Sequence, residues 1–292
     1  EALFHETISN LPDTTRTLLY LWENMGWEQA LLAAWKARGQ GRVIGVLHAP
    51  SVAAYMNFRS FAGSAAEAGN GQDGKLVPDC IVVPGEYTQT TLTEGGWPSG
   101  RLLACEAVRF MHLGESPKPM RQLPEFDRTL LVVTGYLPAE TEEQLGLLAS
   151  VAAMGGLARY AYIRIKPHPY CPVNEIMARL APSFQFTVEQ LPVSDLIDRA
   201  DVVYGANSTS ATLEAVYMGM PVIIAGAGDA MNLNPLVGSK GLHYAVTPAL
   251  LAAQLEAPCR LDTGSRMFNL SPHLTGWRDL LGPAVGSKSR RD

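Results

Sequence analysis

The sequence predicts an α/β protein with two domains, each built around a parallel β-sheet. Two observations predict this class. Short apolar runs alternate with helix-length segments along the 292 residues of the chain, and such alternation is typical of βαβ units with buried parallel strands. A segment rich in proline and charged residues, at 115–127, then separates an early series of these units from a later one.

The secondary structure follows from these runs. Six buried strands are expected at residues 42–47, 80–83, 130–133, 160–165, 201–204 and 222–224. The spacing of apolar side chains predicts helices between the later strands, at residues 140–154, 173–180, 193–200 and 209–218. The aromatic segment 19–28 is expected to be an amphipathic helix.

The proline-rich segment sets the domain boundaries. We place a Rossmann-like N-terminal domain at residues 1–120 and a second Rossmann-like domain at residues 128–275. Residues 267–281 are expected to pack back on the first domain. Residues 286–292, which are mostly Ser, Lys and Arg, are expected to form a disordered tail. A single sheet running through the linker would contradict this organisation.

The composition narrows the function classes. Apolar residues make up 47% and charged residues 17% of the chain, as in ordinary globular proteins. The net charge is -5, so we expect no nucleic-acid partner. The four cysteines form no C-x-x-C pair and indicate neither a zinc site nor a disulfide scaffold. No apolar stretch reaches the ~20 residues that span a bilayer. We therefore expect a cytoplasmic protein, with peripheral contact at the inner face of the membrane left open.

The first cluster of polar side chains is Lys166-Pro167-His168-Pro169, directly after a predicted strand. It therefore lies at the carboxyl edge of the sheet, where ligands bind in open α/β folds. The prolines restrict the backbone, so that the His168 imidazole and the Lys166 ammonium are presented as hydrogen-bond donors to an anion. The alternative is a rigid turn whose histidine is merely exposed.

The second cluster follows the predicted strand at 201–204. Gly205 permits a tight exit from the sheet. Ser208, Thr209 and Ser210 supply hydroxyls beside the free amides of a predicted helix N-terminus, where a phosphate is favoured. The alternative is that one hydroxyl simply caps the helix, and capping is compatible with phosphate binding.

Three further residues are assigned to nucleotide binding. Glu214 lies one turn into the same predicted helix, where its carboxylate can accept hydrogen bonds from the vicinal hydroxyls of a ribose. Stabilisation of the helix dipole is the competing explanation. Asn207 adjoins the hydroxyl cluster, and Gly135 follows the predicted strand at 130–133.

Three stretches of this C-terminal half carry a family resemblance. They are K-P-H-P at 166–169, D-L-I-D-R-A-D-V-V-Y-G at 195–205 and N-S-T-S-A-T-L-E-A-V-Y-M-G-M-P-V-I at 207–223. The series resembles the C-terminal domain of bacterial GT-B glycosyltransferases that use CMP-activated sugars, namely sialyltransferases and Kdo transferases. In those families the histidine and the hydroxyl cluster hold the nucleotide phosphate. The resemblance implies this role for His168, Lys166, Ser208, Thr209 and Ser210, and a ribose contact for Glu214.

The resemblance also implies a reaction. A GT-B-like enzyme of this kind moves Kdo or another sialic-type acid from a CMP-sugar donor to a glycan or lipid-linked glycan of capsule, O-antigen or lipopolysaccharide. No D-x-D motif stands in a suitable loop, so we expect no metal and no cofactor besides the donor substrate. Two alternatives stay open: a CDP-alditol phosphotransferase of the teichoic-acid type, and a non-catalytic or epimerase GT-B relative. The first domain is shorter than the resemblance implies, so further strands are expected upstream of Glu1.

The catalytic carboxylate is expected in the first domain. Glu23 is the leading candidate as base, nucleophile or positioning acid, beside His168 as the second catalytic residue. A carboxylate inside an aromatic helix would be costly to bury without a partner or a role. Weaker candidates are Trp22 and Trp27, which either stack on sugar or belong to the core, and the charged or polar residues Glu28, His48, Glu106, Arg109, Asp13 and Asp79.

Overall fold

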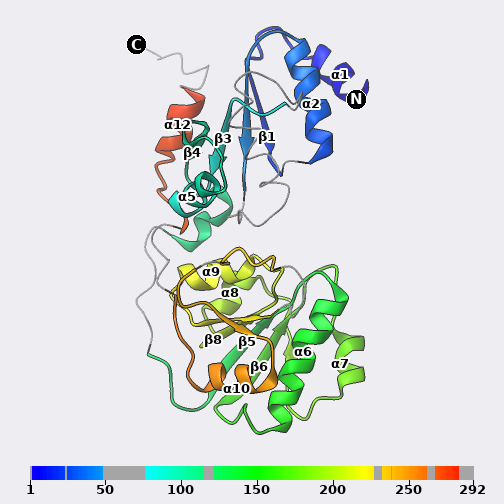
Figure 1. The fold of residues 1–292 in the computed structure, drawn as a ribbon, viewed down its shortest axis with the longest axis vertical. Coiled ribbons are helices and arrows are strands. Elements are labelled where there is room, and N and C mark those ends of the chain that lie inside the picture. Colours follow the sequence, from blue (N-terminus) through cyan, green and yellow to red (C-terminus); the bar gives the residue numbers. More distant parts are fainter. Residues whose placement is uncertain are drawn as a thin grey trace, which may run out of the picture. The chain divides into compact units, whose positions relative to one another are not determined.

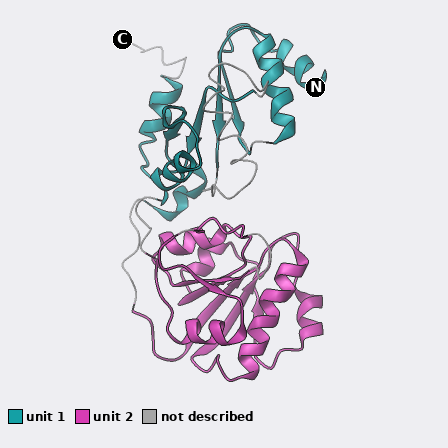
Figure 2. Cartoon of the chain, in the orientation of Figure 1, with its two compact units in different colours: residues 1–115, 266–292 teal, residues 116–265 magenta. Residues whose placement is uncertain are grey.

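The computed structural model describes residues 2–23, 25–48, 76–114, 122–226, 232–237, 239–261 and 267–282. The chain divides into two compact units (Figure 2). Unit 1 comprises residues 1–115 and 266–292, and unit 2 comprises residues 116–265. The tail predicted at residues 286–292 lies outside the described residues.

Unit 1 contains a four-stranded parallel sheet (Figure 1). Its strands lie in chain order, and they are β1 (Thr17–Leu21), β2 (Arg42–Val46), β3 (Cys80–Val83) and β4 (Leu102–Ala104). The described helices of this unit are α1 (Ala2–Ser9), α2 (Gly26–Ala37), α5 (Glu86–Glu94) and α12 (Thr275–Leu281), with 3-10 turns η2 (Ser99–Arg101) and η3 (Val108–Leu113).

The two faces of this sheet have different cores. On one face, α1, α2 and α5 contribute Ile8, Trp35 and Leu92 to a large apolar cluster that also holds Trp22 and Trp97. The other cluster is small, and Trp277 and Leu280 of α12 pack there against buried residues of β2 and β3. Because both faces of a parallel sheet are normally covered, α12 completes unit 1 from the far end of the chain.

Unit 2 contains a six-stranded parallel sheet. Its strands in spatial order are β10 (His243–Ala245), β9 (Val222–Ala225), β8 (Val202–Gly205), β5 (Arg128–Val133), β6 (Tyr160–Lys166) and β7 (Thr187–Val188). The first strand, β5, is central, and the chain builds outward from it on one side and then on the other. This is the strand order of dinucleotide-binding folds, whose ligands bind where the order reverses. In unit 2 the reversal falls between β5 and β8.

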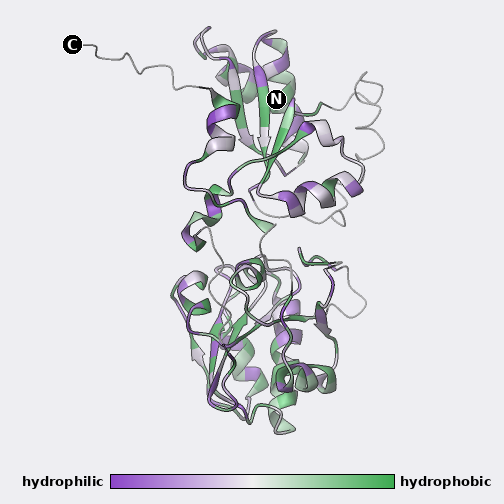
Figure 3. Ribbon diagram, turned by 90° about the vertical axis from the view of Figure 1, so that its left-hand side faces the viewer, coloured by the Kyte–Doolittle hydropathy of each residue, from purple (hydrophilic) through white to green (hydrophobic). Residues whose placement is uncertain are grey.

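Five helices accompany this sheet in the described part of unit 2. They are α6 (Pro138–Ala153), α7 (Asn174–Leu180), α8 (Val193–Ile197), α9 (Ala211–Tyr217) and α10 (Pro248–Glu256). Figure 3 shows hydrophobic and hydrophilic residues in each helical segment, as expected for helices that pack on a sheet through one face. The apolar positions of α6, α7 and α10 join β5, β6 and β8 in one core.

The predicted α/β class with two parallel sheets is confirmed, and every predicted strand is present within a residue or two. The helix predicted at residues 19–28 is wrong. Residues 17–21 form β1, and α2 begins only at Gly26. The short strands β4, β7 and β10 are not predicted, because runs of two or three residues carry too little pattern.

The C-terminal segment belongs to unit 1 from residue 266 onward. Our sequence-based range for the second domain extends to residue 275, whereas the structure assigns residues from 266 onward to unit 1. Hydrogen bonds from Gly276 and Trp277 to Glu106 accompany this packing. The helical pattern alone does not show which sheet such a segment covers.

Candidate functional site

Three loops of unit 2 meet at the carboxyl edge of its sheet. They follow β5, β6 and β8, and they contain Gly135, His168 and Ser208, respectively. Because β5 lies between β6 and β8, its loop contacts both of the others. The His168 amide donates to Thr134 Oγ1 at 3.1 Å, and the space beside Gly135 borders Ser208. The structure therefore brings these sequence-predicted residues together at the strand-order reversal.

His168 is held in a defined orientation. Its Nδ1 accepts a hydrogen bond from the Tyr170 amide at 3.2 Å. In the neutral ring the proton must then be on Nε2, which leaves an N–H donor for a ligand. The rings of Tyr136 and Tyr170 lie 6.0 Å and 5.5 Å from the imidazole. The half-buried Lys166 ends β6 nearby, and its Nζ donates to the Gln190 carbonyl at 3.3 Å.

Ser208 makes two hydrogen bonds to one carboxylate that sequence reasoning missed. Its amide donates to Glu140 Oε1 at 2.7 Å and its hydroxyl to Glu140 Oε2 at 2.5 Å. Glu140 lies in the first turn of α6, two residues after Pro138. A proline followed by an acid is a helix-start signal, so the sequence indicates where Glu140 begins a helix but not that it reaches the loop after β8.

The absent side chain of Gly135 makes room for this pair. A Cβ at residue 135 would lie 2.6 Å from Ser208 Oγ and closer still to Glu140 Oε2. Real Cβ atoms essentially never approach other atoms so closely. A side chain at residue 135 would therefore force the ends of the Glu140 and Ser208 side chains to shift, and φ at this residue is not positive.

The rest of the loop after β8 is well packed. Asn207 is 4% exposed and Thr209 is 9% exposed, whereas Ser208, Ser210 and Glu214 are half-buried. Thr209 Oγ1 accepts a hydrogen bond from the Ala211 amide at 3.3 Å, which stabilises the turn before α9, whereas the N-cap residue Ser210 makes no side-chain capping bond. Helix α9 has only seven residues and begins two residues later than predicted.

Gln144 is a second residue that sequence reasoning missed. It is completely buried, and its Nε2 donates to the carbonyls of Val133 on β5 and Tyr204 on β8, at 3.3 and 3.2 Å. The Tyr204 hydroxyl in turn donates to the main-chain carbonyl of Gln144 at 3.4 Å. These bonds bridge the two strands where they separate into the candidate site. A buried glutamine on an apolar helix face is the signal that the sequence contains.

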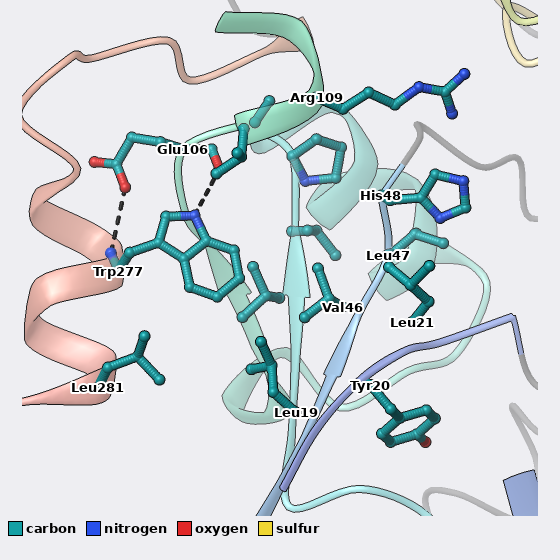
Figure 4. Close-up of a pocket in the computed structure, with 15 residues that line it drawn as sticks. Leu19, Tyr20, Leu21, Val46, Leu47, His48, Glu106, Arg109, Trp277 and Leu281 are labelled. Carbon is teal, nitrogen blue, oxygen red and sulfur yellow. Dashed lines mark hydrogen bonds between the residues drawn. The ribbon is translucent and has the colours of Figure 1, made fainter. Parts of the chain in front are cut away.

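Unit 1 has a pocket of its own, with a volume of ≈ 470 Å³, at the carboxyl ends of β1, β2 and β3 (Figure 4). Its wall is largely apolar, with Leu19, Leu21, Val46, Trp277 and Leu281 among the lining side chains. Such a wall suits an apolar group better than a nucleotide phosphate.

Polar side chains also reach this pocket, and they are His48, Glu106 and Arg109. Burial, and secondly the Arg109 charge, lower the pKa of His48. The Glu106 carboxylate accepts hydrogen bonds from the Gly276 and Trp277 amides at 3.1 and 3.3 Å, and Figure 4 shows the indole of Trp277 bonded to the Glu106 carbonyl. Glu106 therefore anchors the start of α12.

Glu23 lies in the loop after β1 and is exposed. The expectation that Glu23 lies inside a helix is therefore wrong. The buried carboxylate of this region is Glu28, which is 1% exposed and accepts hydrogen bonds from the Glu23 and Met25 amides at 2.8 and 3.1 Å. Burial raises the pKa of Glu28, and these two backbone donors oppose that shift. Glu28, and not Glu23, is thus the buried acid that needs hydrogen-bond partners, and the two amides supply them.

The remaining candidates of unit 1 have structural roles. Trp22 is buried against Trp97 with ring centroids 5.1 Å apart, so its ring is not available to a sugar. Trp27 is exposed and stacks on Phe4 at 6.2 Å. Asp79 accepts a hydrogen bond from the Val43 amide at 2.7 Å and so joins β2 to the start of β3. Asp13 is exposed.

Comparison with known proteins bears mainly on the fold. No protein-family model matches this chain, and no curated protein sequence matches it. Among solved structures, UDP-GlcNAc 2-epimerase from Methanocaldococcus jannaschii, in complex with UDP-GlcNAc and UDP, is similar with a TM-score of 0.60, 12% identity and coverage of 96% of this chain and 78% of that one. The Neisseria meningitidis enzyme of the same name, bound to UDP-GlcNAc, gives a TM-score of 0.60, 12% identity and coverage of 96% and 79%.

A glycosyltransferase is similar as well. The glycotransferase of kitacinnamycin gives a TM-score of 0.50 and 14% identity, with coverage of 87% of this chain and 72% of that one. At these identities the likeness shows the fold, which is GT-B-like. None of the described helices is both long and apolar enough to cross a membrane.

Proposed function

We propose that unit 2 binds the nucleotide of a nucleotide sugar and that the protein acts on the sugar. The observation that carries this proposal is that the loops with His168 and Ser208 both adjoin the loop after β5, at the carboxyl edge of a sheet with the dinucleotide-binding strand order. In open α/β sheets this reversal is where ligands bind. The His168 Nε2–H and the Lys166 ammonium are donors that suit a phosphate.

The proposal divides the nucleotide between the loops. The phosphates lie between the loop after β6 and Ser208, and Glu214 accepts hydrogen bonds from the ribose hydroxyls. Asn207, Thr209 and Ser210 shape the loop after β8, with Thr209 fixing its exit into α9. The positive charge of Lys166 and the His168 donor supply phosphate stabilisation without a metal ion.

The reaction that we favour is epimerisation of a UDP-sugar. Support comes from the two similar structures that are UDP-GlcNAc 2-epimerases, both bound to UDP-GlcNAc. The CMP-sugar transferase implied by the sequence resemblance has weaker support, since the comparisons do not point to CMP.

Glycosyl transfer is the second candidate, and two observations favour it. The K-P-H-P and N-S-T-S stretches resemble CMP-sugar transferases, and the glycotransferase of kitacinnamycin shares the fold. In that reaction a glycan acceptor takes the sugar, and we propose Glu23 as the residue that activates or positions it. Glu23 is exposed in the loop after β1.

Binding and product analysis test these proposals. Calorimetric titration with UDP, CMP and CDP-glycerol is expected to show the tightest binding for UDP. Incubation with UDP-GlcNAc, followed by NMR, is expected to show the C2 epimer with UDP still attached. Preference for CMP, with turnover only of a CMP-sugar, would favour transfer. Binding of none of the three nucleotides would overturn the nucleotide-sugar proposal.

A further inference from the structure

Glu140 occupies the part of the candidate site where an anion would be bound. Both hydrogen-bond donors of Ser208, the amide and the hydroxyl, point at its two carboxylate oxygens. Backbone amides and hydroxyls are also the neutral donors with which proteins bind phosphate. The Glu140 carboxylate is therefore an anion that the protein itself supplies. It occupies the hydrogen-bond donors to which the proposed function assigns a phosphate.

Two other glutamates of unit 2 form ion pairs, whereas Asp201, like Glu140, accepts a hydrogen bond from a neutral donor, the Thr129 amide at 2.9 Å. Glu142, two residues along α6, pairs with Arg179 at 3.0 Å, and Glu189 pairs with Arg164 at 2.7 Å. In each of these ion pairs, a carboxylate contacts a guanidinium of opposite charge. Glu140 instead binds the neutral donors of a loop that is 68 residues away in the chain. A second anion would have difficulty displacing a carboxylate from an ion pair. Neutral donors, in contrast, can release one anion and bind another.

Gly135 leaves the space that such an exchange needs. A side chain at residue 135 would overlap the position of Glu140 Oε2. The volume beside this glycine is filled by the carboxylate, and the preceding residue, Thr134, accepts a hydrogen bond from the His168 amide in the neighbouring loop. A phosphate that replaced the carboxylate would thus lie between Ser208 and His168.

We infer that Glu140 is an internal competitor of the nucleotide phosphate: it keeps Ser208 occupied in the empty enzyme and must leave when the nucleotide binds. This inference rests on the proposed function. The apparent affinity of a ligand is reduced by the fraction of protein that is competent to bind it. Glu140 therefore lowers the affinity for the phosphate while it holds the empty loop in shape.

Charge removal at Glu140 tests this role. Glu140→Gln keeps the size of the side chain, and Glu140→Ala frees Ser208 entirely. Glu143→Gln is the matched control, since it removes the same charge from the same helix at an exposed position. Each variant is titrated calorimetrically with UDP, and with uridine, which has no phosphate. Circular dichroism reports whether each variant is folded.

The expected result is tighter UDP binding by about tenfold in Glu140→Ala, a smaller gain in Glu140→Gln, and no change in Glu143→Gln. Uridine affinity stays the same in all of them. Equal UDP affinity in parent, Glu140→Gln and Glu143→Gln would overturn the inference alone. Weaker UDP binding in folded Glu140→Gln would also overturn it, because the carboxylate would then contact the ligand. Absence of UDP binding in the parent and in every variant would overturn the proposed function, and this inference with it.

Discussion

The carboxyl edges of the two parallel sheets have opposite chemistry. In unit 1, the ends of β1, β2 and β3 form a pocket with a largely apolar wall, into which α12 contributes Trp277 and Leu281. In unit 2, the ends of β5, β6 and β8 bear hydroxyls, an imidazole, an ammonium and a carboxylate. The same fold edge therefore has different chemistry in the two units, and strand order alone does not show which ligand it takes.

The tryptophans make the two units experimentally separable. All five tryptophans, at positions 22, 27, 35, 97 and 277, belong to unit 1. Tryptophan fluorescence therefore reports unfolding of unit 1, while calorimetry and far-ultraviolet circular dichroism report both units. Each substitution below is expected to act on one unit and leave the other unchanged.

His168→Ala is expected to have the largest effect. It removes the N–H donor that we propose binds the phosphate, so UDP affinity is expected to fall roughly tenfold to a hundredfold, since a hydrogen bond to a charged group contributes about 1.5–3 kcal/mol. Turnover is nearly lost. The exposed His273 of unit 1 provides the control, and His273→Ala leaves both quantities at the parent level. Parent-like UDP affinity in His168→Ala would show that this histidine does not hold the nucleotide.

Gly135→Ala tests the packing of the unit 2 site. The added methyl group overlaps the Glu140–Ser208 pair, so these two side chains must shift, and we expect weaker UDP binding and a loss of stability of about 1–3 kcal/mol. The tryptophan transition of unit 1 stays unchanged. Gly146→Ala, within α6, is the control, because the nearest atom there lies 3.9 Å from the new Cβ. That control should be neutral or more stable by about 0.5–1 kcal/mol. Equal behaviour of the two variants would refute the close-approach argument.

Glu28→Gln is expected to affect only unit 1. It weakens the hydrogen bonds to the Glu23 and Met25 amides, at a cost of about 1–2 kcal/mol in the tryptophan-detected unfolding. UDP affinity does not change. Because burial raises the folded-state pKa of Glu28, its contribution is complete below its unfolded pKa and declines as pH rises through the folded pKa. The cost should thus be larger at pH 4 than at pH 7, and the reverse trend would contradict the assignment.

Glu23→Gln is the companion to that substitution. We expect it to leave the tryptophan transition and UDP affinity unchanged, because Glu23 is exposed and lies in unit 1. If the second candidate reaction holds, its transfer activity falls sharply. Retained transfer by Glu23→Gln would remove Glu23 from the catalytic residues.

His48 gives the smallest expected effect. Burial and Arg109 lower its pKa, so NMR titration should place its midpoint below the usual value near 6.5. Arg109→Gln should raise that midpoint while burial keeps it below the usual value. A midpoint in the parent at or above that of an exposed histidine would mean that the pocket is well hydrated.

Much of the architecture was accessible from the sequence, for identifiable reasons. Strands such as 130–133 and 222–224 are continuous apolar runs, as expected for strands that are buried on both faces of a parallel sheet. The error at residues 19–28 arose because Leu-Tyr-Leu-Trp fits both periods over so short a stretch. Residues 17–21 alternate between the two faces of the sheet, whereas the helix begins at Gly26.

The site was only partly accessible. His168 and Ser208 follow strong strands, so their place at the sheet edge could be predicted from position alone. Glu140 and Gln144 could not, because their partners lie 68 and 60 residues away and are set by how α6 packs. The anchoring of α12 by Glu106 is likewise a contact across 170 residues. Local sequence patterns specify elements, and such long-range polar contacts depend on the tertiary arrangement.

Amide hydrogen exchange with and without UDP-GlcNAc tests the central claim most directly, because it reports both sheet edges in one experiment. The claim is that the nucleotide binds at the strand-order reversal of unit 2. The predicted result is slower exchange on ligand addition at residues 134–137, 168–171 and 206–210, with the amides of residues 46–48 and 105–109 unchanged. Slower exchange confined to those unit 1 amides, with the three loops of unit 2 unaffected, would contradict the account.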